Sequence, residues 1–182
     1  HTGPVVEQQA PAVVAGLGQV HDLADAGFPE LGDRVGEERL AAIQPVLQSR
    51  TQTLSARAQR EGLTDRILTE AAAHVFVAAK EHLGKSLYRE QQFAGRALAS
   101  ELVIQLATGE GKTLASLTPL YAHALMNRGM VTQVTTGDFY AARDFQETQG
   151  VFRLLGMSSS AVTRNGALFS NPALLTPQLI EG

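Results

Sequence analysis

Residues 102 to 113 read Leu102-Val103-Ile104-Gln105-Leu106-Ala107-Thr108-Gly109-Glu110-Gly111-Lys112-Thr113. A compact apolar run, typical of a buried strand, leads into a loop with two glycines and then into a helical pattern. Gly109 and Gly111 let the backbone turn its N–H groups inward, so that successive amides can surround a phosphate. In such a loop Lys112 would bridge the β- and γ-phosphates of a nucleotide, and Thr113 would offer its hydroxyl to Mg²⁺.

The spacing of the loop distinguishes two forms of phosphate-binding motif. The general form Gly-x-x-x-x-Gly-Lys-Thr needs a glycine at position 106, where this chain has Leu106. The form present is Thr-Gly-x-Gly-Lys-Thr, which is typical of helicase-like motors. A turn that holds these residues by chance is the alternative, and the strand pattern before the loop and the helical pattern after it disfavour that alternative. Glu110, between the glycines, is assigned no catalytic role.

Before the loop, one or two helices are predicted over 37–60, with an interruption at Pro45, followed by a helix between Thr64 and Gly84 and a shorter one at 89–100. Thr64 is the expected N-cap of the second helix, and Gly84 is its expected stop. After the loop, helices are predicted at 112–125 and 138–155, and strands at 131–136 and 158–163 in addition to 102–106. Strands that alternate with helices of this length predict an α/β fold with a parallel sheet and right-handed crossovers.

Composition limits the kinds of site that the chain can hold. Its 182 residues include 15 Lys and Arg against 18 Asp and Glu, so the net charge of -3 predicts no general attraction to nucleic acid. Cysteine is absent, and the five histidines do not fall at metal-ligand spacing. No apolar run approaches the roughly 20 residues of a membrane-spanning helix, so we expect a soluble chain.

Three segments of the chain resemble one family. Thr108-Gly-Glu-Gly-Lys-Thr113, with a glutamate between the glycines, resembles the ATP-binding loop of SecA, the motor ATPase family of bacterial preprotein translocation. Gln91 lies 21 residues before Lys112, in a segment that resembles the family's Phe-Asp-Val-Gln segment. The run from Val134 to Asp144 resembles the family's Val-Thr-Val-Asn-Asp-Tyr-Leu-Ala-x-Arg-Asp. The resemblance covers about residues 37–163.

The resemblance implies a RecA-like P-loop domain, a parallel sheet with flanking helices, preceded by a helical N-terminal region. Residues 1–33 would be a loosely structured lead-in, 34–100 the helical region, and 101–182 the first part of the nucleotide-binding domain, ending before its acidic Walker-type strand. The implied cofactors are ATP and Mg²⁺. Gln91 would hydrogen-bond the adenine edge, and Arg143 would lie on the nucleoside side of the pocket.

No catalytic residue is expected within the chain. The expected nucleotide-binding residues are Thr108, Gly109, Glu110, Gly111, Lys112, Thr113, Gln91 and Arg143, with Thr113 also the metal ligand. The resemblance implies a motor that couples ATP turnover to protein export, working from the cytoplasm at the inner membrane. Its implied partners are the preprotein, the membrane translocation channel and the remainder of the motor, with no nucleic acid.

Two other functions stay open. A helicase-like nucleic-acid motor shares the loop form, although the net charge and the lack of a basic stripe argue against it. A divergent, non-enzymatic remnant would keep the fold and bind no nucleotide. No Asp-Glu-x-Asp segment follows an apolar strand in the chain, so we expect negligible hydrolysis by this part alone.

Overall fold

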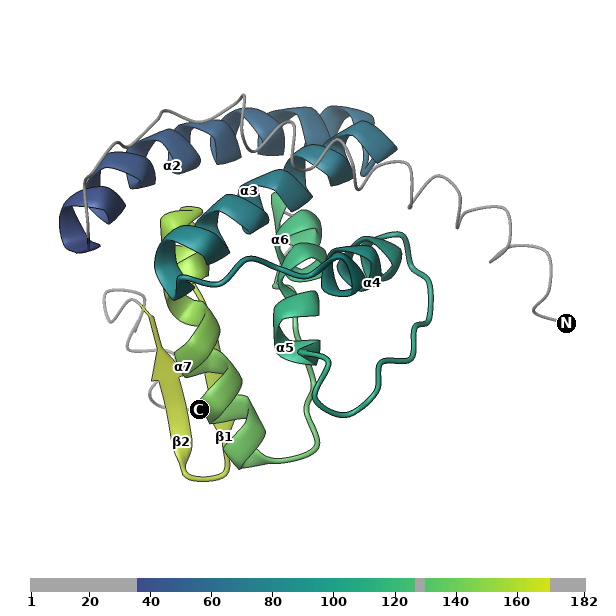
Figure 1. Cartoon of the computed structure of the whole chain (residues 1–182), viewed down its shortest axis with the longest axis vertical. Coiled ribbons are helices and arrows are strands. Elements are labelled where there is room, and N and C mark those ends of the chain that lie inside the picture. The colour runs from purple at the N-terminus through teal and green to yellow at the C-terminus, as the bar shows by residue number, and fades with distance from the viewer. Residues whose placement is uncertain (1–35, 127–129, 171–182) are drawn as a thin grey trace, which may run out of the picture.

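The computed structural model describes residues 36–126 and 130–170 of the chain. Most of these residues are helical, and one small sheet lies beside the last helix (Figure 1). The lead-in predicted for residues 1–33 and the turns predicted for residues 171–182 lie outside the described residues.

Helix α3 (Asp65–Leu83) lies at the centre of the fold and contacts α2 (Gly36–Glu61), α4 (Arg89–Ala99), α6 (Leu117–Leu125) and α7 (Asp138–Leu154). Nearly every position from 67 to 79 is buried, as expected for a helix that is apolar on all sides. Its predicted ends are confirmed, because the Thr64 hydroxyl accepts from the Ile67 N–H and Gly84 takes the left-handed conformation (φ 63°).

Helix α2 runs without a break through Pro45, where the sequence predicted an interruption. Proline removes the hydrogen bond to the carbonyl four residues earlier, which belongs to Ala41. Both Pro45 and Ala41 are exposed, so water can satisfy that carbonyl and the helix continues. The opposite side of α2, including Ile43 and Leu47, is buried in the core beside α3 (Figure 1).

The predicted helix at 112–125 is divided into α5 (Lys112–Ala115) and α6 by Ser116. Pro119 explains the division, since it has no N–H to donate to the Ala115 carbonyl. That same carbonyl lies against α4: a Cβ on Gly95 would be 2.7 Å from the Ala115 oxygen. Glycine at position 95 therefore allows α4 to approach α5 and α6 closely.

A buried polar cluster joins three helices of the core. The Tyr121 hydroxyl of α6 lies 2.8 Å from the Thr51 hydroxyl of α2 and 2.9 Å from Nδ1 of His74 in α3. Burial lowers the pKa of His74 to about 4, so the imidazole is neutral at physiological pH. These hydrogen bonds hold the segment that follows the phosphate-loop sequence against the N-terminal helices.

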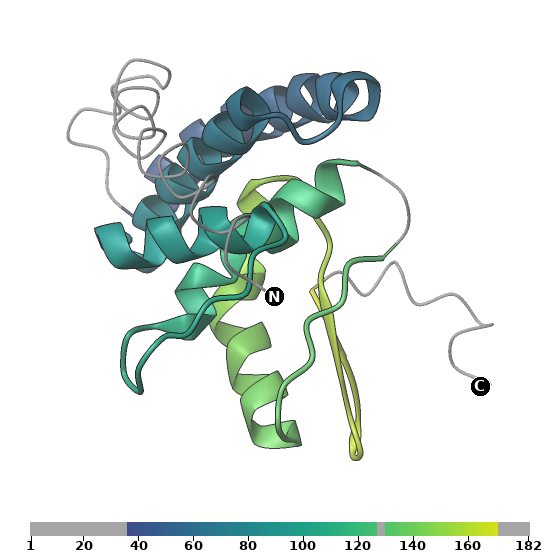
Figure 2. The ribbon, with the colours of Figure 1, turned by 90° about the vertical axis from the view of Figure 1, so that its right-hand side faces the viewer.

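The only strands in the described ranges are β1 (Ser160–Thr163) and β2 (Gly166–Phe169), which pair in an antiparallel hairpin. The strand predicted at 158–163 is thus confirmed in part, but its partner is the next segment of the chain rather than a parallel neighbour. The hairpin lies along α7, and Arg164 at its turn forms an ion pair with Asp138 at the start of α7 (2.8 Å). Figure 2 shows the hairpin edge-on and residues 130–137 as an extended segment that leads to α7.

The segments 102–106 and 131–136 were predicted as strands, and neither is a strand in the described structure. A strand exists only where a neighbour completes its hydrogen-bond ladder, and these segments have no such neighbour among the described residues. The first segment still alternates, since Leu102, Ile104 and Leu106 are half-buried while Val103 is 96% exposed. The described fold is therefore mostly helical, and a parallel sheet is not among its elements.

Candidate functional site

The glycine loop joins the segment 102–106 to α5 and exposes its tip to solvent. Gly109 (φ 90°) and Gly111 (φ 75°) both have left-handed backbone, which a residue with a Cβ rarely adopts. Gly111 is the N-cap of α5, and its carbonyl accepts from the N–H groups of Leu114 and Ala115. The backbone conformation of the loop therefore favours glycine at both positions.

The two charged side chains of the loop fold back onto its own backbone. The Lys112 ammonium donates to the Ala107 carbonyl at 2.7 Å, and the Glu110 carboxylate accepts from the Ala107 N–H at 2.6 Å. Both side chains are exposed, and neither is part of the core. Lys112 thus holds its positive charge over the loop, while Glu110 places a negative charge at the same backbone unit.

Gln91 lies underneath the loop and is only 5% exposed. Its Oε1 accepts from the Tyr88 N–H at the start of α4 (3.0 Å), and its Nε2 donates to the Glu110 carbonyl (3.1 Å). The fit is close, because a Cβ on Gly111 would lie 2.2 Å from this Nε2. A primary amide has two N–H donors and two lone pairs, so Gln91 retains one of each beyond these bonds.

Thr113 lies in α5 beside the first turns of α7. Its hydroxyl donates to Oδ1 of Asp144 at 3.1 Å. The Arg143 guanidinium binds the same carboxylate oxygen, with Nη2 at 2.7 Å and Nε at 3.1 Å. The Arg143 guanidinium also lies 5.1 Å from the centre of the Tyr140 ring, and its hydrogen bonds to Asp144 raise the pKa of Arg143.

The structure brings the eight predicted binding residues to one region, where the loop meets the starts of α4 and α7. Thr108 to Thr113 form the loop, Gln91 contacts its backbone at Glu110, and Nη2 of Arg143 lies 3.5 Å from the Thr113 hydroxyl. The sequence did not predict the contact between Asp144 and Thr113. In the sequence, Arg143 and Asp144 are adjacent, and this adjacency is equally compatible with a solvated ion pair on the surface of a helix.

The donor set of this region suits a nucleotide-bound Mg²⁺ better than a metal held by the protein alone. Among the described residues, no three or more His, Cys, Asp or Glu side chains are grouped so that they could hold a metal ion. Mg²⁺ in nucleotide sites takes most of its ligands from phosphates and water, with one or two from the protein. The Thr113 hydroxyl could be such a protein ligand, whereas the Lys112 ammonium and the glycine backbone suit the phosphates.

Comparisons with known proteins agree on one family. Residues 34–173 match the SecA DEAD-like domain. The chain is 37% identical over 130 residues to the protein translocase subunit SecA of Orientia tsutsugamushi (strain Boryong), covering 71% of this chain and 15% of that protein. It is 35% identical over 133 residues to the chloroplastic protein translocase subunit SECA1 of Arabidopsis thaliana, covering 73% and 13%. It is 40% identical over 116 residues to SecA of Micrococcus luteus, covering 64% and 13%. The chain thus spans about one seventh of the length of these curated relatives.

Proposed function

Because the chain belongs to the SecA DEAD-like domain family, we propose that it is the ATP-binding part of a motor that couples ATP hydrolysis to protein export. The observation that carries this proposal is the loop itself. Two left-handed glycines, an exposed lysine and a threonine hydroxyl lie within five consecutive residues, from Gly109 to Thr113. That combination would offer backbone amides, one ammonium group and one hydroxyl to a triphosphate and its metal ion.

Lys112 is the residue that we expect to bind the triphosphate. Its hydrogen bond to the Ala107 carbonyl is exposed, and a phosphate oxygen would replace this neutral acceptor with one whose charge is opposite to that of the ammonium. Glu110 opposes the same ligand, because its carboxylate lies at the same backbone unit. We therefore propose that ATP binding moves Lys112 away from Ala107 and Glu110 away from the phosphates.

Gln91 and Arg143 complete the proposed site. The amide group of Gln91 has one donor and one acceptor left, which matches the alternating donor and acceptor groups of an adenine edge. Arg143 was predicted on the nucleoside side, and in this structure its guanidinium lies beside the Thr113 hydroxyl. Its role on the nucleoside side stays a prediction.

We further propose that the segments 102–106 and 131–136 become strands of a RecA-like parallel sheet in the whole SecA domain. Val103 and Val134 support this proposal, because both are apolar and almost fully exposed. A sheet buried on both faces by helices would cover them. Hydrogen exchange on a full-length SecA that contains this sequence should show protected amides at 102–106. Rapid exchange at those amides in the full-length protein would contradict the proposal.

The partners follow from the family and are also proposals. The preprotein, the translocation channel and the rest of the motor would act with this part at the cytoplasmic face of the inner membrane. No helix in residues 36–126 or 130–170 is long and apolar enough to cross a bilayer.

The direct test is ATP binding by the Lys112→Ala variant, measured by titration calorimetry and by thermal unfolding. The parent should be stabilised by about 2.7 kcal/mol at an Mg-ATP concentration of 100 times Kd, and the variant should lose most of this gain. Lys80→Ala is a matched control, because Lys80 is an exposed lysine at the end of α3. Equal affinities in Lys112→Ala and the parent would remove the proposed role of the loop.

Two outcomes would favour the alternatives. If Mg-ATP gives no thermal shift with the parent chain, the domain is a non-enzymatic remnant of the SecA fold. If RNA stimulates the ATPase of the full-length protein and preprotein does not, the motor acts on nucleic acid.

A further inference from the structure

Asp144 and Thr113 are 31 positions apart in the chain and are joined by one hydrogen bond between α7 and α5. The Asp144 carboxylate is 15% exposed, so most of its surface is withdrawn from water. Its Oδ1 accepts from the Thr113 hydroxyl and from two nitrogens of Arg143. The position of this carboxylate is therefore set by contacts on two sides.

The direction of the hydrogen bond decides what the Thr113 hydroxyl can do. A hydroxyl has one proton and two lone pairs, whereas an ionised carboxylate can only accept. Thr113 must therefore direct its proton toward Asp144. A hydroxyl that ligates a cation needs the same arrangement, with a lone pair toward the ion and the proton turned away from it.

We propose that Asp144 is a positioning residue for the Mg²⁺ of bound ATP, acting through the Thr113 hydroxyl. This inference rests on the proposed ATP-binding function and adds a residue that the sequence did not assign to the site. Groups that orient a metal ligand by a hydrogen bond commonly change metal affinity by about 10- to 100-fold when they are removed. Asp144 meets this description, because its carboxylate accepts a hydrogen bond from the proposed metal ligand, the Thr113 hydroxyl.

Arg143 explains how a carboxylate can lie so close to a proposed phosphate site. An unpaired negative charge there would repel the triphosphate. The Arg143 guanidinium neutralises Asp144 through two hydrogen bonds to Oδ1, and their contact raises the pKa of Arg143. The pair leaves the hydrogen-bond acceptor in place while removing most of its net charge.

The experiment compares ATP affinity in the presence of Mg²⁺ with ATP affinity in EDTA, by titration calorimetry on the 182-residue chain. Asp144→Ala should reduce the gain in affinity that Mg²⁺ provides by about 10- to 100-fold. This gain is the ratio of the affinities with Mg²⁺ and in EDTA, so an effect of the lost charge that is common to both conditions cancels. Asp144→Asn should recover most of the gain, because its carbonyl oxygen can still accept from Thr113. Asp138→Ala is the matched control: it removes a carboxylate from the same helix that pairs with Arg164 instead.

A second comparison tests whether Asp144 acts through Thr113. In a Thr113→Val background the ligand hydroxyl is absent, so adding Asp144→Ala should cause no further loss of the Mg²⁺ effect. If Asp144→Ala unfolds below the assay temperature, Asp144→Leu keeps a similar shape without the acceptor and takes its place. Its expected effect on the Mg²⁺ gain is the same.

The results distinguish this inference from the function on which it rests. If the parent binds ATP and Asp144→Ala lowers affinity equally with Mg²⁺ and with EDTA, the residue only links α5 to α7 and the inference is wrong. An unchanged Mg²⁺ effect in Asp144→Ala, or additive losses in the double variant, would overturn it too. A parent chain that binds no ATP under either condition overturns the proposed function itself.

Discussion

The side-chain amide of Gln91 donates to the backbone carbonyl of Glu110 across 3.1 Å, and thereby joins α4 to the tip of the glycine loop. The contact exists because Gly111 has no Cβ, since a methyl group there would lie 2.2 Å from the Gln91 nitrogen. Gln91 also accepts from the Tyr88 N–H, so one buried side chain connects the start of a helix to the loop. The ATP affinity of the site should therefore be sensitive to single substitutions in the glycine loop.

Gly111→Ala should reduce ATP affinity more than Gly109→Ala. Both positions are left-handed, so both variants carry a backbone penalty of about 1–2 kcal/mol. Only the methyl group at 111 meets Gln91, whereas a Cβ at 109 meets nothing within 4 Å. Thermal unfolding should thus show similar or greater destabilisation for Gly111→Ala, and calorimetry should show the larger loss of binding. Equal losses of affinity in the two variants would show that the contact with Gln91 does not matter for nucleotide binding.

Glu110→Gln should raise ATP affinity about fivefold. The substitution removes a negative charge from the loop, and a unit charge about 4 Å from another is worth about 1 kcal/mol in water. The glutamine oxygen can still accept from the Ala107 N–H, so the loop should keep its backbone conformation. Competition binding at low salt would measure the change, and the gain should shrink at high salt.

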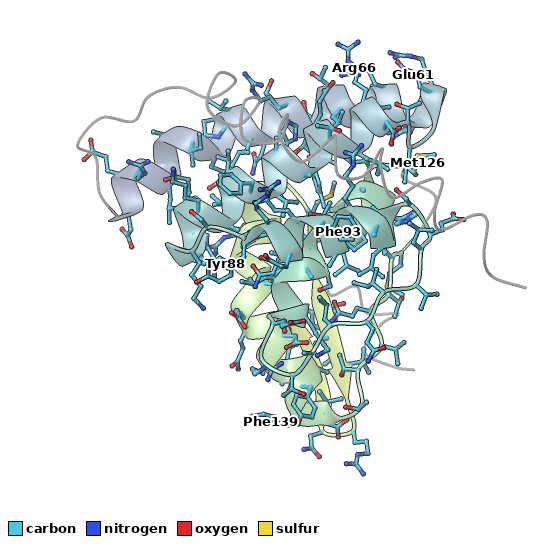
Figure 3. All side chains as sticks on the ribbon, turned by 45° about the vertical axis from the view of Figure 1, so that its right-hand side comes forward. Glu61, Arg66, Tyr88, Phe93, Met126 and Phe139 are labelled. Carbon is cyan, nitrogen blue, oxygen red and sulfur yellow. The ribbon has the colours of Figure 1, made fainter. Side chains whose placement is uncertain are left out.

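Glu61→Gln is the control for this charge effect. It makes the same change at the end of α2, and Glu61 lies at the opposite end of the molecule from Phe139 at the start of α7 (Figure 3). Its ATP affinity should equal that of the parent. If both variants bind ATP more tightly by the same factor, the effect comes from net charge and not from the loop.

Arg96→Ala should destabilise the fold by about 2–4 kcal/mol and lower Tm by about 5–15 °C. The Arg96 side chain is 1% exposed and donates to the Thr69 hydroxyl and to the Asp65 carbonyl, the latter at 3.1 Å. Its removal leaves these acceptors without their donor and opens a cavity between α4 and α3. Arg89→Ala, an exposed arginine in the same helix, should change stability by less than about 0.5 kcal/mol. A Tm for Arg96→Ala that matches that of Arg89→Ala would contradict the importance of the buried guanidinium.

Stability should fall as pH decreases from about 6.5 to about 4 because of His74. Burial lowers the pKa of His74 from 6.5 to about 4 in the folded chain, so within this range the unfolded chain binds a proton that the folded chain excludes. The expected loss is about 3 kcal/mol in total. Burial also lowers the pKa of His82, which contributes in the same direction. Urea unfolding at several pH values should show a flatter pH dependence for His74→Gln than for the parent.

Tyr121→Phe tests whether the Tyr121 hydroxyl affects the pKa of His74 in addition to burial. The variant removes the hydroxyl that lies 2.9 Å from Nδ1 but keeps the aromatic ring that buries the imidazole. The variant should be less stable than the parent at every pH. Since desolvation is the main cause of the lowered pKa, its free energy of unfolding should change with pH as steeply as that of the parent. A flat pH profile in Tyr121→Phe would mean that the hydrogen bond controls the titration.

Most helix ends could be predicted from the sequence, because their signals act within a few residues. Thr64 and Gly84 cap α3 as expected, since a hydroxyl that accepts a backbone N–H and a left-handed glycine need no distant partner. Pro45 was misread for a tertiary reason: the carbonyl that it leaves unpaired faces water. One helix was predicted over 112–125, and its division at Ser116, which Pro119 explains, became visible only in the structure.

The main difference between the predicted and the described fold is the parallel sheet, because a strand depends on a partner strand that local sequence patterns do not identify. The apolar runs at 102–106 and 131–136 have the composition of strands, yet neither forms a ladder among the described residues. The segment 160–163 pairs with 166–169 because a two-residue turn places these residues next to each other. Such short-range pairing needs no other part of a domain.

Local chemistry in the chain was enough to indicate the phosphate loop, since Gly109, Gly111, Lys112 and Thr113 are consecutive or nearly so and the backbone conformation depends on the glycines. The arrangement around that loop was decided by packing. Helix α4 brings Gln91 beneath Glu110, and α7 brings Asp144 to Thr113, across separations of 19 and 31 positions in the chain. A short motif determines the local conformation of its own segment. A hydrogen bond between distant segments forms only after their helices have packed against a common core.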